Sequence, residues 1–345
     1  MEMKIALMET PGNIKIKEVE KPKPKDDELL VQIKHVGICG SDIHYYEHGR
    51  IGDFVVEKPI ILGHESAGVV VDMGKNVKNF EIGDSVTIEP GYTCGKCEYC
   101  LSGRYNLCPD VIFMATPPYD GAFSEYVAYP AYMVFKLPKN MSTLEGALIE
   151  PLAVGIYSTD LGEAKLGQSA VILGSGAIGL CTLMSLKAKG INEIYVVDVL
   201  ENRLNKAKEL GATKTINAKD EDPIKVVMDF TNGEGVDMVY EAAGHPTTIL
   251  QTSKFVKKGG VVVLIGMSAN SVVPYDFGTL MGKEASIKTV FRYRNIYPKA
   301  IKSVADGIIP ISKIVTNTFK MDEIPFAMDY SVKNKSDIVK AVIEM

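Results

Sequence analysis

Residues 166–186 carry no charged side chain, and this apolar stretch constrains the fold more than any other part of the sequence. A run of this length could cross a bilayer as a helix. However, Gly174, Gly176 and Gly179 interrupt it, and the strand-like run 170–173 precedes them. We therefore expect a buried strand, a tight turn and a buried helix rather than a membrane span.

The turn in this stretch has the pattern G-x-G-x-x-G, read as Gly-Ser-Gly-Ala-Ile-Gly over residues 174–179. Between a buried strand and an apolar helix, this pattern is typical of a dinucleotide site. The glycines allow a tight turn and a close approach to the pyrophosphate, and the helix N-terminus favours its negative charge. The residues expected to bind the dinucleotide are Gly174, Gly176, Ala177, Ile178 and Gly179.

The next strand ends at Asp198, nineteen residues after Gly179. A carboxylate there can accept hydrogen bonds from the adenosine ribose and would repel a 2′-phosphate. Asp198 therefore favours NAD over NADP, with a plain strand-end cap as the alternative. Arg203 is expected to pack or stack near the adenosine.

The rest of the chain shows two kinds of organisation. Up to about residue 150, short β-rich runs such as 29–33 and 67–71 lie between Gly and Pro residues, which indicates an irregular, mostly β domain. Strands and helical segments then alternate, which indicates a parallel sheet with helices on both faces. The expected strands are 170–173, 193–197, 238–240 and 261–265, with a helix over 201–210. From about Thr289 the chain is irregular again, and it ends in a helical-looking segment, 338–345, that we expect to return to the first domain.

Four of the six cysteines lie within fifteen residues, with the spacing C-x2-C-x2-C-x7-C. Four thiolates at about 2.3 Å suit a tetrahedral zinc ion, and short glycine-containing turns let one loop surround it. Two local disulfides are the alternative, but such short spacings would strain them. A shell of four thiolates leaves no open position, so this zinc would be structural. The ligands are Cys94, Cys97, Cys100 and Cys108.

Composition and charge limit the kinds of partner and the cellular compartment that we expect. The net charge is −5, and no polybasic run occurs, which gives a nucleic-acid partner no electrostatic support. The N-terminus begins with an acidic residue and lacks a long apolar core, unlike a signal peptide. Metal-bound thiols rather than a disulfide framework fit a reducing compartment, so we expect a cytoplasmic protein without membrane attachment.

A second metal site is suggested by residues outside this cysteine cluster. Cys39 lies in Cys-Gly-Ser-Asp, His64 and Glu65 follow an apolar run, and Glu150 lies in apolar sequence where a carboxylate needs a neutralising partner. Cys, His and Glu are suitable ligands for a catalytic zinc with one open position. A lone buried cysteine and a capping His-Glu pair are the alternative explanation.

Taken together and in this order, these motifs resemble those of zinc-dependent medium-chain dehydrogenases over essentially the whole chain. Within that family the chain is most similar to sorbitol dehydrogenase and related polyol dehydrogenases. The segments that carry this closer resemblance are 44–52, 113–118, 150–155 and 290–293. The resemblance implies a GroES-like β catalytic domain, residues 1–153 and 289–345, with a structural-zinc lobe at about 90–110. It also implies a Rossmann NAD-binding domain with a doubly wound parallel sheet, residues 154–288, and a homotetramer.

The resemblance further implies roles for individual residues. Cys39, His64 and Glu65 would hold the catalytic zinc, with Glu150 alternating as a ligand or holding the zinc-bound water. The proton would leave through Glu150, or through Ser41, the nicotinamide ribose and His44. The side chains implied to contact a polyol are Tyr45, Phe113, Thr116 and Arg292.

The expected reaction is oxidation of a secondary alcohol of a polyol, with sorbitol to fructose favoured and hydride transfer to NAD. Xylitol, another polyol or 2,3-butanediol are alternative substrates in the same class. Threonine is disfavoured because threonine dehydrogenases usually lack the Glu-Pro-Leu motif found here at 150–152. A catalytically silent relative that only binds nucleotide is the alternative from another class.

Overall fold

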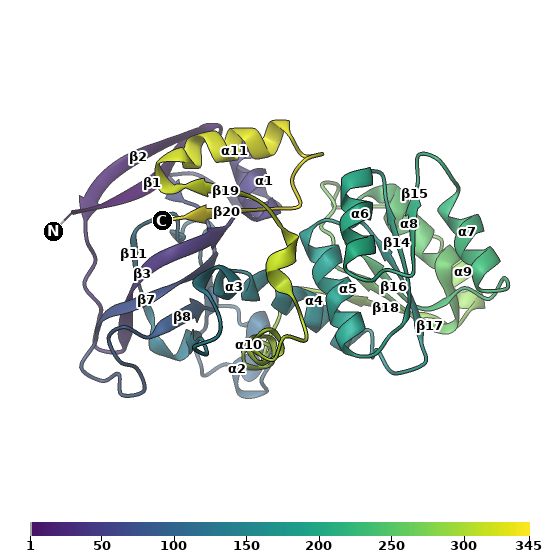
Figure 1. Ribbon diagram of the computed structural model, residues 1–345, viewed down its shortest axis with the longest axis horizontal. Coiled ribbons are helices and arrows are strands. Elements are labelled where there is room, and N and C mark those ends of the chain that lie inside the picture. The colour runs from purple at the N-terminus through teal and green to yellow at the C-terminus, as the bar shows by residue number, and fades with distance from the viewer. Residues whose placement is uncertain (1) are drawn as a thin grey trace. The chain divides into compact units, whose positions relative to one another are not determined.

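The computed structural model describes residues 2–345 and divides the chain into two compact units. Unit 1 contains the described residues through Glu150, together with Tyr297–Gly307 and Ile311–Met345. Unit 2 contains Pro151–Ile296 and Ile308–Pro310. The chain passes from unit 1 into unit 2 within one helix, α4 (Ile149–Leu161) (Figure 1). The domain boundaries 153/154 and 288/289, which the family resemblance implies, stay a prediction.

Unit 1 is built mainly from strands, as its alternating short β-rich runs predict. A seven-stranded sheet has the order β12-β8-β7-β3-β20-β19, with β11 also paired to β3, and a smaller sheet has the order β2-β1-β6. The strands are β1 (Glu2–Thr10), β2 (Asn13–Glu20), β3 (Glu28–Gly37), β4 (Arg50–Ile51), β5 (Phe54–Val55), β6 (Ile60–Ile61), β7 (Glu65–Met73), β8 (Ser85–Ile88), β9 (Gly91–Tyr92), β10 (Ile112–Phe113), β11 (Tyr126–Pro130), β12 (Val134–Lys136), β19 (Val315–Lys320) and β20 (Lys340–Glu344). The helices are α1 (Gly40–His48), α2 (Glu98–Leu101), α3 (Thr143–Ala147), α10 (Tyr297–Ala305) and α11 (Ile324–Lys333), with a 3₁₀ turn, η1 (Tyr105–Leu107), after α2.

The end of the chain differs from the expectation. The helix predicted for residues 338–345 is wrong, because Lys340–Glu344 forms strand β20. This strand pairs antiparallel with β3 and parallel with β19, so the tail does return to the sheet of unit 1. Four of its five residues are buried. A strand covered on both faces lacks the apolar–polar alternation by which strands are recognised in sequence.

Unit 2 is a six-stranded parallel sheet with helices on both faces, which confirms the prediction from alternating strands and helices. Its strand order is β15-β14-β13-β16-β17-β18. The strands are β13 (Ser169–Leu173), β14 (Glu193–Asp198), β15 (Lys214–Asn217), β16 (Val236–Glu241), β17 (Val256–Leu264) and β18 (Ser286–Thr289). The helices are α5 (Ala177–Ala188), α6 (Glu201–Glu209), α7 (Pro223–Phe230), α8 (Pro246–Phe255) and α9 (Phe277–Gly282). Figure 1 shows α5 and α6 on one face and α7 and α9 on the other. The sequence did not reveal the two edge strands, β15 and β18, which are short and only partly apolar.

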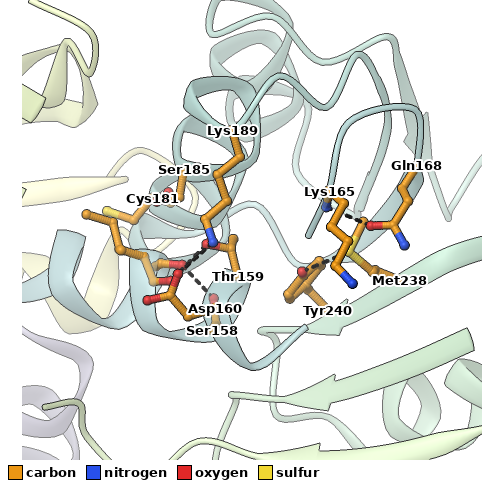
Figure 2. Close-up of polar contacts among 12 residues, drawn as sticks. Ser158, Thr159, Asp160, Lys165, Gln168, Cys181, Ser185, Lys189, Met238 and Tyr240 are labelled. Carbon is orange, nitrogen blue, oxygen red and sulfur yellow. Dashed lines mark hydrogen bonds and ion pairs between the residues drawn. The ribbon is translucent and has the colours of Figure 1, made fainter. Parts of the chain in front are cut away.

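Within unit 2, helices α4 and α5 approach closely (Figure 2). A Cβ on Gly155 would lie within 2.8 Å of the Cys181 side chain, so only glycine allows this approach. The Ser158 hydroxyl lies 3.4 Å from that of Thr182, and Lys189 pairs with Asp160 at 2.6 Å. The apolar stretch 166–186 therefore contains β13, a turn and most of α5, as expected. Across residues 2–345, no helix combines the length and the apolar character needed to cross a membrane.

Candidate functional site

The first candidate ligand, Cys39, lies at the start of helix α1. It occupies the N-cap position and is half-buried. Asp42, in the first turn of α1, is fully buried. One of its oxygens accepts a hydrogen bond from the Cys39 N–H and the other accepts one from the Gly63 N–H, both at 2.9 Å. Asp42 thereby ties the segment that carries Cys39 to the one that carries His64.

The second candidate ligand, His64, is buried beside these anions. Its Nδ1 lies 3.7 Å from an oxygen of Asp42. Burial alone would lower the pKa of His64, but Cys39 and Asp42 outweigh it and hold this pKa well above the ordinary value. The ring of Phe113 is tilted against the imidazole, with 5.6 Å between the ring centroids. Without a metal these anions attract a proton to His64, and a bound cation would take the place of that proton.

The third candidate ligand, Glu65, begins strand β7 and is paired with a buried lysine from the end of the chain. Lys340 Nζ donates to one Glu65 oxygen at 2.6 Å and also contacts the other. It donates in addition to the Ile38 carbonyl at 3.0 Å. Burial opposes the charge of Lys340, but Glu65 and Cys39 raise its pKa above the ordinary value. Lys340 is therefore held as a cation beside Glu65 inside unit 1.

The chemistry and clustering of these residues fit a zinc site. One ligand atom each of Cys39, His64 and Glu65 lies within 4.8 Å of the others. A thiolate, an imidazole and a carboxylate are the donor set of a catalytic zinc with a fourth position open. Glu150 is buried but lies outside this group. Its negative charge nevertheless raises the pKa of Lys340, so it belongs to the same electrostatic environment.

The four clustered cysteines, Cys94, Cys97, Cys100 and Cys108, meet in one lobe around α2 and η1. All four are free thiols, with sulfur–sulfur distances of 4.0 Å between Cys94 and Cys100, 3.5 Å between Cys97 and Cys100, and 3.6 Å between Cys108 and Cys94. Sulfurs at about 2.3 Å from one zinc ion lie about 3.8 Å apart in a tetrahedron. Backbone N–H groups of Lys96 and Cys97 lower the pKa of Cys94 to about 7, which favours the thiolate that zinc binds. The geometry fits a closed four-thiolate shell.

The glycine pattern in unit 2 forms the turn between β13 and α5. Gly174 has φ +95°, a conformation that favours glycine, and its N–H donates to the Val197 carbonyl at 2.8 Å. A Cβ on Gly179 would collide with the Gly174 carbonyl, so glycine is required for the helix to pack on the strand end. Helix α5 begins at Ala177, and no side chain caps its N-terminus. Its first N–H groups are available to a phosphate.

Asp198 ends β14 beside this turn. One of its oxygens accepts hydrogen bonds from the Ser175 N–H and hydroxyl, at 2.7 and 3.0 Å. The other accepts from the N–H groups of Val199 and Leu200, at 2.7 and 3.0 Å. Arg203, on α6, directs its guanidinium towards Gly176, where a Cβ would lie 3.7 Å from it. Asp198 therefore holds the turn in place, a role in addition to the ribose contact predicted for it.

The other predicted residues are distributed over both units. In unit 1, Tyr45 is 3 % exposed within the core, Phe113 and Thr116 are half-buried, Ser41 is half-buried and His44 is exposed. Partial burial lowers the pKa of His44, as does the neighbouring His48. Arg292 belongs to unit 2, where it has φ +55° and stacks its guanidinium over Phe291 at 5.0 Å. Their roles in proton transfer and substrate binding stay predictions.

Sequence reasoning missed Asp42 and Lys340, which support the candidate ligands. Asp42 lies in the Cys-Gly-Ser-Asp motif, and its place in that motif was the only feature of the sequence that pointed to it. Lys340 is 275 residues from Glu65, and nothing near it in the sequence marks a buried charge.

Comparisons with known proteins identify the family. Residues 25–139 match the model of the alcohol dehydrogenase GroES-like domain, and residues 177–306 match that of the zinc-binding dehydrogenases. The chain is 45% identical to an uncharacterized zinc-type alcohol dehydrogenase-like protein of Escherichia coli (strain K12), over 99% of this chain and 98% of that protein. It is 41% identical to sorbitol dehydrogenase of Bacillus subtilis (strain 168), over 99% and 97% of the two chains.

Solved structures give the same result. An Escherichia coli oxidoreductase/dehydrogenase of unknown specificity superposes with a TM-score of 0.96 at 44% identity, over 100% of this chain and 99% of that one. A short chain alcohol dehydrogenase from E. coli CFT073, complexed with NADH, superposes with a TM-score of 0.92 at 29% identity, over 100% and 99%. These matches confirm the predicted combination of a GroES-like domain with a Rossmann-type parallel sheet.

Proposed function

This chain belongs to the family of zinc-binding dehydrogenases with a GroES-like alcohol dehydrogenase domain, and we propose that it oxidises a secondary alcohol of a polyol with NAD. The observation that carries the proposal is the convergence of Cys39, His64 and Glu65 within 4.8 Å in a buried site. Sorbitol is the favoured substrate and fructose its product. The 41% identity to a sorbitol dehydrogenase supports this choice, as do the polyol-type segments in the sequence.

The metal-binding residues have distinct tasks in this proposal. When bound, zinc supplies Lewis-acid polarisation of the substrate hydroxyl. Cys39, His64 and Glu65 would hold the ion, and Asp42 orients His64 from its Nδ1 side. Glu65 is preferred over Glu150 as the direct ligand because it lies within the three-residue group. Glu150 would then be the alternative ligand to Glu65.

The substrate proton leaves through residues of this chain. Ser41 and His44 lie on α1, three positions apart along the helix, so both lie on adjacent turns of one face. The lowered pKa of His44 keeps its imidazole neutral at pH 7 and able to accept a proton. Tyr45, Phe113, Thr116 and Arg292 bind the remaining hydroxyls, and the five donors of Arg292 suit several hydroxyl acceptors.

Asp198 selects NAD in this proposal. Its carboxylate lies next to the glycine turn and disfavours a 2′-phosphate at the adenosine ribose. The family resemblance also supports a homotetramer, which light scattering on the purified protein would test. The six free thiols fit a cytoplasmic location, where they stay reduced.

Initial rates of NAD reduction test the substrate class. We would compare sorbitol, xylitol, ribitol, 2,3-butanediol and threonine, each with and without prior chelator treatment. Chelator-sensitive turnover of the long polyols is the expected result. Turnover confined to butanediol or threonine would refute the roles given to Tyr45, Phe113, Thr116 and Arg292.

A pair of cysteine variants separates catalysis from nucleotide binding. Cys39→Ser is expected to abolish turnover and leave NAD binding intact, whereas Cys181→Ala, in the core of unit 2, should keep both. NAD binding without turnover in the wild-type protein would instead support the silent, nucleotide-binding alternative.

A further inference from the structure

A partly buried hydrogen bond joins the cysteine lobe to the strand segment that leads to the candidate metal site. The Tyr105 hydroxyl donates to an oxygen of Glu89 at 2.6 Å. From this bond we propose that Tyr105 and Glu89 are positioning residues, through which the metal state of the lobe acts on the site formed by Cys39, His64 and Glu65. The inference rests on the proposed function, because it requires a metal at that site.

Tyr105 moves with the lobe because it lies between two of the four cysteines. It opens η1, and its carbonyl accepts a hydrogen bond from the Cys108 N–H at 3.0 Å. The preceding Arg104 N–H donates to the Tyr99 carbonyl at 2.7 Å, which closes the turn after α2. A metal held by the four sulfurs therefore fixes the position of the Tyr105 hydroxyl.

Glu89 is a buried acid that the proposed mechanism does not use. Only 3 % of it is exposed, and it follows β8 directly. Its N–H donates to the Met133 carbonyl at 2.9 Å, and the carbonyl of the preceding Ile88 accepts a bond from Tyr297 of α10 at 2.9 Å. The backbone of this segment is thus fixed, and the Glu89 side chain is directed to Tyr105.

From Glu89 the chain runs directly into the wall of the metal site. The Pro90 carbonyl accepts a bond from the Met114 N–H at 3.0 Å, and Gly91 pairs with Phe113 between β9 and β10. A Cβ on Gly91 would lie 2.9 Å from the Phe113 ring, so strand and ring are in direct contact. The centroid of the Phe113 ring in turn lies 5.6 Å from that of the His64 ring.

A second connection is electrostatic and involves Glu150. Burial raises the pKa of Glu89 to about 7. The hydrogen bond from Tyr105 opposes this increase in pKa, and the negative charge of Glu150 adds to it. Glu150 also acts on Lys340, the partner of Glu65. A displacement of Glu89 would therefore alter both the Phe113–His64 contact and the charges around Glu65. Because binding free energies are coupled reciprocally, occupation of the catalytic site must also affect the lobe.

Variants that keep the lobe folded test this coupling. Tyr105→Phe removes only the hydroxyl, Glu89→Gln keeps the shape of its acceptor, and Tyr99→Phe is a matched control on the same lobe. Loss of a partner for a buried carboxyl is expected to lower kcat about tenfold in Tyr105→Phe. Glu89→Gln should show a similar loss, and the double variant should be no worse than either single variant, since both act along one path. Zinc content and KM should match those of Tyr99→Phe.

A spectroscopic readout tests the same coupling without a substrate. In cobalt-substituted protein, the visible bands that disappear in Cys39→Ser belong to the catalytic site. We expect these bands to shift in Tyr105→Phe and to stay unchanged in Tyr99→Phe.

Three results would overturn the inference: unchanged bands and kcat in Tyr105→Phe, additive losses in the double variant, or loss of the lobe zinc from Tyr105→Phe. Absence of any Cys39-dependent band in the wild-type protein would refute the proposed function itself, and the inference with it. If only the coupling fails, the Cys39-dependent bands will be present in the wild-type protein and will not shift in Tyr105→Phe.

Discussion

At the scale of the residue, Asp198 combines two demands. Its carboxylate accepts four hydrogen bonds from protein groups, two of them from Ser175 in the glycine turn. An adenosine ribose bound beside this turn would have to share the two Asp198 oxygens with these protein donors. In our proposal, the conformation of the turn and the choice of cofactor therefore depend on the same side chain.

Asp198→Ser is expected to relax the preference for NAD and also to weaken binding of NAD itself. The first effect follows from the loss of repulsion towards a 2′-phosphate, and the second from the loss of the bonds that hold Ser175. Dissociation constants for NADH and NADPH, measured by fluorescence titration, check both effects. Unchanged discrimination between the two cofactors would contradict the ribose role and leave the turn-holding role alone.

At the scale of the element, the ends of helices and strands in unit 2 are stabilised by side chains from other segments. The C-terminal carbonyls of a helix lack intrahelical partners. For α8, Lys283 supplies the missing partner. Its Nζ donates to the carbonyls of Ser253 and Lys254, at 2.9 and 3.1 Å, and to that of the C-cap residue Val256 at 2.6 Å. Partial burial lowers the pKa of this ammonium group, with Asp276 opposing.

Lys283→Met should lower the free energy of unfolding by about 1–3 kcal/mol, because it leaves several carbonyls without their charged donor. Lys258→Met removes an exposed lysine of the neighbouring strand and is the matched control. Urea unfolding of both variants measures the difference. An equal effect of the two substitutions would show that Lys283 does not cap α8.

The end of strand β16 is held by Glu241, whose side chain is fully buried. One of its oxygens accepts bonds from the N–H groups of Ala243 and Gly244, at 3.0 and 2.9 Å, and from the Thr248 hydroxyl at 2.7 Å. Burial raises the pKa of Glu241 despite these bonds. The folded protein therefore binds this proton more tightly than the unfolded chain does.

It follows that ionisation of Glu241 destabilises the fold. The Glu241 side chain contributes most to the unfolding free energy below its pKa in the unfolded chain, about 4.3. This contribution falls as pH rises from there through the higher pKa of the folded protein. Relative to Glu241→Gln, the wild-type protein should lose unfolding free energy as pH rises above the unfolded pKa. Urea unfolding at several pH values checks this, with Glu234→Gln as an exposed control. A difference between wild type and Glu241→Gln that does not change with pH would contradict it.

At the scale of the whole molecule, unit 1 is completed by the two ends of the chain. Strand β20 lies between β3 and β19, and it brings Lys340 to Glu65. Both members of this pair are buried, with relative exposures of 3 % and 1 % for their side chains. The strand that closes the sheet of unit 1 therefore also brings a counter-charge to the candidate metal site.

Lys340→Met should destabilise the metal-free protein by about 3–5 kcal/mol, because it leaves Glu65 charged and buried without its partner. Added zinc should recover part of this loss, since the ion would neutralise the same carboxylate. Thermal unfolding with and without zinc measures both effects. Lys333→Met, which removes an exposed pair with Asp329, should have little effect in either condition. Equal zinc responses in Lys340→Met and Lys333→Met would contradict a metal at Glu65.

The sequence alone determined the features that depend on local spacing. The turn between β13 and α5 and the four clustered cysteines each occupy a short segment, within which residue type and spacing already specify the geometry. The four central strands of unit 2 were predicted for the same reason, since their apolar runs are continuous.

Only the tertiary structure decided features that depend on distant segments. Strand β20 is buried on both faces, so its sequence carries no alternating pattern and its β conformation comes from pairing with β3 and β19. The partnership of Lys340 with Glu65, like that of Tyr105 with Glu89, joins residues whose neighbours in sequence give no sign of it. A buried charge is tolerated only where the fold supplies its counter-charge, and that supply is a property of the assembled sheet rather than of any segment.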